Sequence, residues 1–131
     1  MPIVDIQIVG ELASSDHLAQ HLADAMGAVL SPDRSGATWV RLHWLAAQDY
    51  AESGGAGATE PVFVQLTLAR WPSVGAREKQ SKLIAQVAAK VCGRPAESVH
   101  VVYSPPAAGR VAFGGRLVPP DAASSAVLEE S

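Results

Sequence analysis

Apolar and polar positions alternate at the start of the chain, which predicts a strand there. Val4, Ile6 and Ile8 take every second position of residues 3–9, the spacing of a strand with one buried face. Apolar residues then recur at helical spacing up to a loop at residues 31–37; they are Leu18, Leu22, Ala25, Met26 and Val29. Residues 38–45 return to a strand pattern, so this part of the chain predicts a β-α-β unit.

Three polar residues precede the predicted helix. Ser14, Ser15 and Asp16 are good N-cap residues, because their side-chain oxygens accept hydrogen bonds from the unpaired backbone N–H groups of a first turn. We therefore expect the helix to begin directly after them.

The same order of elements returns in the second half. Residues 62–68 alternate like a strand, residues 76–91 carry a helical stripe and residues 98–103 form another predicted strand. Gly93 and Pro95 are expected to end the helix. The apolar stripe of this helix consists of Leu83, Ile84, Val87 and Val91.

The two halves resemble an internal duplication. Pro2 and Pro61 lie 59 positions apart, and so do the segments that start at Trp39 and Ser98. A helical crossover joins parallel strands in a right-handed sense, so two units predict an α+β fold with a four-stranded sheet and both helices on one face. The expected organisation is one domain with a loose tail: residues 1–118 for the domain, 2–48 and 61–118 for its repeats, 49–60 for a linker, and 119–131 for the tail.

Composition narrows the classes of function. The chain carries 10 basic and 13 acidic residues, a net charge of −3, whereas a general nucleic-acid binder needs a basic surface. No apolar run approaches the roughly 18 residues of a membrane span, and the first residues lack the positive charge of a secretory signal. We therefore expect a cytoplasmic protein with neither nucleic-acid nor membrane partners.

The residues that commonly bind metals are sparse. Cys92 is the only cysteine, which excludes an intramolecular disulfide and a cysteine-based zinc site, and we expect it to be a small core residue. His17 and His21 lie one helical turn apart, but the sequence offers them no third ligand nearby. We expect no metal site.

The amount of apolar sequence points to self-association. Hydrophobic residues make up 48% of the chain and aromatic residues only 5%. A domain of this length has a limited core. We therefore expect some apolar surface to be buried against other copies of the chain.

Several segments, in this order, resemble the tautomerase superfamily. They are a strand that begins at Pro2 directly after Met1, VRLHW at 40–44, VFVQLTLAR at 62–70 followed by the helical REKQSKL, and SVHVVYSPP followed by FGGRL. This superfamily includes 4-oxalocrotonate tautomerase, 5-carboxymethyl-2-hydroxymuconate isomerase, malonate semialdehyde decarboxylase, cis-3-chloroacrylic acid dehalogenase and macrophage migration inhibitory factor. The resemblance implies that Met1 is removed, that Pro2 becomes the N-terminus, and that three chains pack their sheets inward as a homotrimer.

The resemblance also implies an activity that needs no cofactor. A generic α-amino group titrates at about 7.7–8.0, and burial or nearby cations lower that pKa because both disfavour the charged form. The resulting base operates near neutral pH, which suits general acid–base catalysis. The implied function is a tautomerase or isomerase of small 2-oxo or 2-hydroxy unsaturated carboxylic acids, with Pro2 as the general acid/base.

Arginines are the expected ligands of the substrate carboxylate, because a guanidinium binds a carboxylate with two parallel hydrogen bonds. Arg41 lies inside a strand and matches the Arg-apolar-His-Trp pattern of the isomerase. Arg70 ends a strand, where the dehalogenase and decarboxylase patterns also carry an arginine. Arg77, at the start of a helix, is the alternative to Arg70.

Two aromatic residues complete the candidate site. Tyr103 matches a tyrosine of the dehalogenase pattern, so its hydroxyl either binds substrate or belongs to a half-buried core residue. Phe113 stands where that pattern has a glutamate that activates water, and is expected instead to line an apolar pocket.

Two other functions stay open. A hydratase, dehalogenase or decarboxylase of the same superfamily would use protonated Pro2 as an acid, but it would also need a water-activating carboxylate, for which the sequence offers no convincing candidate. A non-catalytic trimeric binding protein would keep the fold without the chemistry.

Overall fold

The computed structural model describes residues 2–55 and 59–120. Met1, part of the expected linker and residues 121–131 of the expected tail lie outside the described residues. The strands are β1 Ile3–Val9, β2 Trp39–Leu45, β3 Val62–Thr67, β4 Val99–Tyr103, β5 Ala112–Phe113 and β6 Arg116–Leu117. The helices are α1 Leu18–Leu30 and α2 Val74–Cys92, with short 3-10 helices η1 Ala47–Asp49 and η2 Ala96–Ser98.

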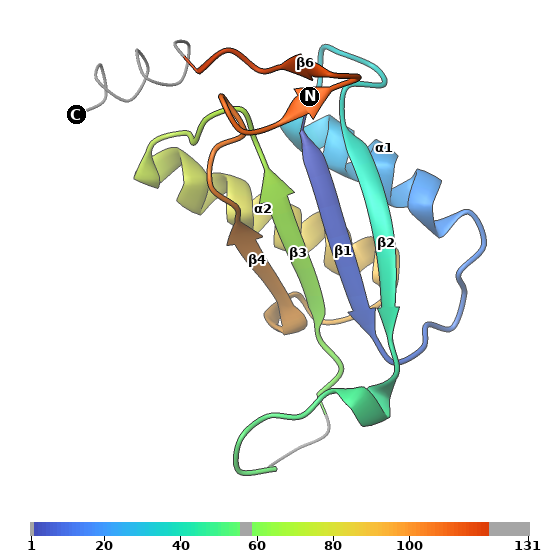
Figure 1. Ribbon diagram of the computed structural model, residues 1–131. Coiled ribbons are helices and arrows are strands. Elements are labelled where there is room, and N and C mark those ends of the chain that lie inside the picture. The colour runs from blue at the N-terminus through green and yellow to red at the C-terminus, as the bar shows by residue number, and fades with distance from the viewer. Residues whose placement is uncertain (1, 56–58, 121–131) are drawn as a thin grey trace.

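Four of the strands form one sheet in the order β2-β1-β3-β4. β1 pairs in parallel with β2 and β3 pairs in parallel with β4, whereas the two central strands β1 and β3 are antiparallel. Each parallel pair is joined by one helix, as expected for two β-α-β units. The antiparallel centre has a consequence for the site, because β1 begins at the end of the sheet where β3 and β4 finish (Figure 1).

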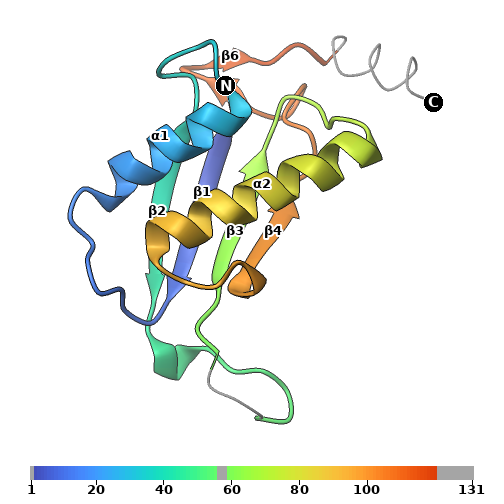
Figure 2. The same cartoon turned by 180° about the vertical axis from the view of Figure 1, so that it is seen from behind.

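Both helices cover the same face of the sheet (Figure 2). The core lies between the two layers, because every second residue of each strand points toward the helices. Its fully buried members from the two central strands are Val4, Ile6, Ile8, Val62, Val64 and Leu66. Leu22 and Met26 of α1 and Ile84 and Ala88 of α2 meet them from the helical layer. The expected α+β architecture is confirmed, and the other face of the sheet is open in the single chain.

The expected N-cap of α1 is wrong, although the helix begins at Leu18, the first apolar residue of the predicted stripe. Ser14, Ser15 and Asp16 do not cap the helix; His17 occupies the N-cap position with a left-handed φ of 53° and no side-chain cap. The backbone carbonyl of Ser15 instead accepts a hydrogen bond from Leu18 N at 3.2 Å. A backbone turn therefore leads the chain into α1.

The second helix also differs from expectation in two respects. It begins at Val74 rather than residue 76, because the Ser73 side chain accepts a hydrogen bond from Ala76 N and so acts as its N-cap. Leu83, expected in the buried stripe, is 51% exposed. Ile84, Ala88 and Cys92, spaced four apart, take the positions that face the sheet.

Candidate active site

Pro2 lies at the start of β1, at the end of the sheet where N is marked in Figure 1. Its carbonyl accepts a hydrogen bond from Trp39 N at 2.9 Å, which aligns the beginnings of β1 and β2. The removal of Met1, on which a Pro2 base depends, concerns a residue outside the described part of the chain.

An aromatic pair lies beside Pro2. Phe113 packs edge-on against Trp39, with ring centroids 5.4 Å apart and ring planes at 82°, an arrangement in which the ring edge meets the π-face. Phe113 is carried there by the β5–β6 hairpin, whose turn residues Gly114 and Gly115 have φ of 57° and 85°. Two successive positive φ values favour glycine, which has no side chain to clash. The hairpin therefore provides apolar cover at the Pro2 end of the sheet.

Arg41 lies on the open face of the sheet and already has a carboxylate partner. Its Nε and Nη2 donate to the two carboxylate oxygens of Asp5 at 2.7 and 2.9 Å, and His43 Nε2 lies 3.1 Å from Asp5 Oδ1. The hydrogen bond from Arg41, with a further one from His43, lowers the pKa of Asp5 against the opposing effect of burial. The same ion pair raises the pKa of Arg41. Any substrate that binds Arg41 must therefore share this guanidinium with Asp5.

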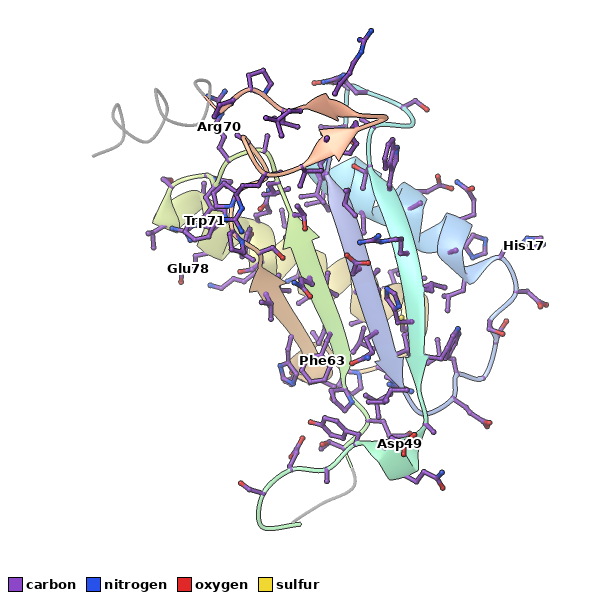
Figure 3. The ribbon with its side chains drawn as sticks, viewed as in Figure 1. His17, Asp49, Phe63, Arg70, Trp71 and Glu78 are labelled. Carbon is purple, nitrogen blue, oxygen red and sulfur yellow. The ribbon has the colours of Figure 1, made fainter. Side chains whose placement is uncertain are left out.

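Arg70 lies close to the end of β3, in the connection to α2. Ile3 pairs with Thr67 across the central strands, so the segment that follows Thr67 emerges at the Pro2 end of the sheet. Figure 3 places Arg70 and its neighbour Trp71 at this end, while Phe63 and Asp49 lie at the opposite end. The Arg70 side chain is exposed.

Tyr103 and Arg77 lie on the helix side of the sheet. The Tyr103 hydroxyl donates to Gln80 Oε1 at 2.6 Å and lies 3.4 Å from the Arg77 carbonyl. Burial raises the pKa of Tyr103, and the nearby charge of Arg77 opposes that shift. The Arg77 guanidinium lies 4.8 Å from the centroid of a Trp71 ring. In the single chain these two residues thus attach β4 and the connection after β3 to α2.

The structure brings five of the six expected site residues to one end of the sheet: Pro2, Arg70, Phe113, Arg77 in the first turn of α2 and Tyr103 at the end of β4. Of these, Tyr103 and Arg77 lie on the helix side of the sheet, whereas Arg41 lies further along β2, on the open face. Sequence reasoning missed Asp5, Trp39 and Trp71. Trp39 and Trp71 had a visible signal, since each adjoins or lies close to an expected site residue, but the pairing of Asp5 with Arg41 depends on the strand register.

Other candidate sites are weak. Among residues 2–55 and 59–120 no group of three or more His, Cys, Asp or Glu side chains could hold a metal ion. A hollow of about 410 Å³ lies along α1 and the loop before β2, and its lining does not include Pro2. No helix in the part of the chain that the structure describes is long and apolar enough to cross a membrane. Cys92 is buried, and burial raises the pKa of its thiol.

Known structures share this arrangement although the sequences differ. A fused 4-OT, described as a wild-type symmetric trimer, superposes with a TM-score of 0.70 over 88% of this chain and 94% of its own, at 15% identity. Pt0534 inactivated by 2-oxo-3-pentynoate gives a TM-score of 0.72 over 92% of this chain and 97% of its own, at 16% identity. This is the tautomerase fold.

The tautomerase fold extends to a further group of structures. The macrophage migration inhibitory factor of Oncomelania hupensis matches with a TM-score of 0.68 over 99% of this chain and 92% of its own, at 13% identity. No protein-family model matches the sequence, and neither does any curated protein. The similarity therefore lies in the fold.

Proposed function

We propose that this protein is a cofactor-independent tautomerase or isomerase of small 2-oxo or 2-hydroxy unsaturated carboxylic acids. The observation that carries the proposal is the placement of Pro2 at the start of β1, with Arg70 and the Phe113–Trp39 pair at the same end of a tautomerase fold. Once Met1 is removed, Pro2 is a secondary amine at the end of the sheet where the β5–β6 hairpin and Arg70 lie. Burial of that nitrogen and the positive charge of Arg70 at the same end would disfavour the ammonium form and poise the amine as a base near neutral pH.

The roles of the other residues follow from their chemistry. Arg70 binds the substrate carboxylate and stabilises the negative charge that develops on the 2-oxo oxygen as the enol forms. Pro2 takes a proton from the enol hydroxyl or the α-carbon and returns it at the other position. Arg41 lies inside β2 on the open face, further from Pro2 than the segment that carries Arg70, so we assign it the smaller contribution.

We further propose that three copies assemble with their open sheet faces inward. In addition to the Asp5–Arg41 pair, the open face of the described chain carries apolar side chains; two of them are Trp39 on β2 and Val102 on β4, each about half exposed. Burial of such residues against other copies favours association. The symmetric-trimer forms of the fused 4-OT are of the same fold.

The proposed activity is tested by ketonisation of phenylenolpyruvate or 2-hydroxymuconate. We expect Pro2→Ala to lower kcat/KM by about 10²-fold or more, the usual contribution of a positioned general base, because a freely rotating primary amine replaces the fixed ring nitrogen. Arg70→Ala is expected to raise KM more than Arg41→Ala does. Intact-mass measurement is the first control, since the native chain must lack Met1.

Three results would contradict the proposal. A native chain that retains Met1 has an amide nitrogen at Pro2, which cannot act as a base. A wild-type protein with no turnover above buffer between pH 6 and 9 would favour the non-catalytic binding protein. Equal activity of wild type and Pro2→Ala would assign the chemistry to another group.

A further inference from the structure

The backbone just before Arg70 is attached to the loop that follows β4. Ala107 N donates to the carbonyl of Leu68 at 2.8 Å, and Ala108 N donates to the carbonyl of Ala69 at 3.1 Å. Leu68 and Ala107 are both buried. The chain is therefore fixed up to the residue before Arg70, although β3 itself ends at Thr67.

The residue just after Arg70 is attached to the end of β4. The indole N–H of Trp71 donates to the carbonyl of Ser104 at 2.8 Å. Ser104 is itself held by β3, because its backbone N donates to Leu66 O at 2.8 Å and its hydroxyl accepts a hydrogen bond from the Gln65 side chain at 2.7 Å. Arg70 thus lies between two attached neighbours, on a segment outside the regular strand (Figure 3).

The Trp71 ring is supported from the helix side. The Arg77 guanidinium lies 4.8 Å from the centroid of a Trp71 ring, within the range of a cation–π contact. Arg77 Nε also donates to the carbonyl of Pro72 at 3.1 Å, and the Tyr103 hydroxyl lies 3.4 Å from the Arg77 carbonyl. Trp71 therefore joins three elements: the connection after β3, the end of β4 and the first turn of α2.

We propose that Trp71 is a positioning residue for Arg70, with Arg77 holding the Trp71 ring in place. The inference rests on the proposed function, in which Arg70 binds the substrate carboxylate. A carboxylate ligand on an unanchored segment must be ordered when substrate binds, and that ordering weakens binding. The indole hydrogen bond to Ser104 orders the segment in advance. Arg77 and Tyr103 then act through Trp71 and need not touch the substrate.

Trp71→Phe tests this role, because phenylalanine keeps an aromatic ring for Arg77 but removes the N–H donor. We expect the backbone order parameter of Arg70, measured by ¹⁵N relaxation, to fall from the rigid value of about 0.85 toward about 0.6. With phenylenolpyruvate we expect KM to rise about threefold to tenfold, the effect of one lost hydrogen bond, while kcat stays within about twofold. The pH profile of kcat should not shift, since Pro2 is untouched.

Trp44→Phe is the matched control, because Trp44 is a half-exposed tryptophan on β2; it should change neither the order of Arg70 nor KM. An unchanged Arg70 order parameter in Trp71→Phe would overturn the inference. So would an Arg70→Ala variant with the KM of an active wild type. An inactive wild type would instead contradict the proposed function, and the relaxation comparison would still decide whether Trp71 orders Arg70.

Discussion

Asp5 and Arg41 form a two-bonded ion pair across β1 and β2 on the open face of the sheet. The Arg41 side chain is 65% exposed and that of Asp5 20% exposed, so solvent screens the pair and its contribution to stability is modest. The pair matters more for orientation than for stability, because its two parallel hydrogen bonds fix the plane of the Arg41 guanidinium. Asp5 thus occupies on Arg41 the position that a substrate carboxylate would take.

The lowered pKa of Asp5 predicts a pH-dependent contribution to stability. Because this pKa is lower in the folded chain than in the unfolded chain, the contribution is fully present above the unfolded value of about 3.9 and is lost as the pH falls through the folded value. We expect the free energy of unfolding of the wild type to exceed that of Asp5→Asn at pH 6 and the difference to shrink below about pH 4. Urea unfolding of both proteins as a function of pH measures it.

Arg41→Gln is the companion variant for this experiment. This substitution removes the other half of the ion pair. The free energy of unfolding of Arg41→Gln should therefore also approach that of the wild type as the pH falls from 6 to below about 4. Curves that stay parallel to the wild type down to pH 2.5 in both variants would mean that the pair does not stabilise the fold.

At the scale of elements, the two helices begin and end in different ways. α2 has a side-chain N-cap at Ser73 and a left-handed Gly93 at its C-terminus, with Gly93 N donating to Ala89 O. α1 has no side-chain N-cap and ends at Ser31, whose backbone N donates to Gly27 O. The end of α2 was expected from Gly93, because glycine favours the left-handed cap. The N-cap of α1 was not expected, because the turn at Ser15 and the φ of His17 leave no mark in residue type.

Gly75 in the first turn of α2 and Gly93 at its C-cap should respond in opposite directions to the same substitution. Gly93→Ala places a side chain in the left-handed region, where φ is 68°, and should lower the free energy of unfolding by about 1 kcal/mol. Gly75 lies in the first turn of α2 with nothing near the position of an added Cβ, so Gly75→Ala should raise it by up to about 0.5 kcal/mol. Denaturant unfolding of the wild type, Gly93→Ala and Gly75→Ala measures both changes in the free energy of unfolding. If both substitutions changed it in the same direction, the left-handed role of Gly93 or the helical role of Gly75 would be contradicted.

How far the site could be predicted depends on which physical rule places each residue. Alternation along β4 puts Val99, Val101 and Tyr103 on one face, so the helix-side position of Tyr103 was available from the sequence. The Asp5–Arg41 pair was not, because it requires the register that sets Ile3 opposite Trp39. Helical spacing likewise identified the apolar stripe of α2 but not which of its edges faces the sheet.

At the scale of the whole molecule, charge is distributed unevenly between the two ends of the sheet. The topology places five arginines at the Pro2 end, in the loops, the first turn of α2 and the hairpin: Arg34, Arg70, Arg77, Arg110 and Arg116. Six acidic residues of the described chain lie at the other end: Glu11, Asp16, Asp49, Glu52, Glu60 and Glu97. A net charge of −3 thus conceals a basic end that attracts anions, as the proposed carboxylate substrate requires.

The open face of the sheet gives the last prediction, because the chain offers two apolar residues of equal exposure on opposite sides. Val102 is 50% exposed on the open face, and Leu83 is 51% exposed on α2. If the open faces meet in a trimer, Val102→Glu buries a charge that has no partner there, which is strongly unfavourable. We expect Val102→Glu to sediment or elute as a folded single chain of 13.6 kDa and Leu83→Glu to keep the mass of three chains.

Light scattering with size-exclusion chromatography measures the mass of both variants, and circular dichroism confirms that each variant is folded. A Val102→Glu protein that stays trimeric would exclude the open face as the interface, whereas dissociation of Leu83→Glu alone would move the interface to the helical layer.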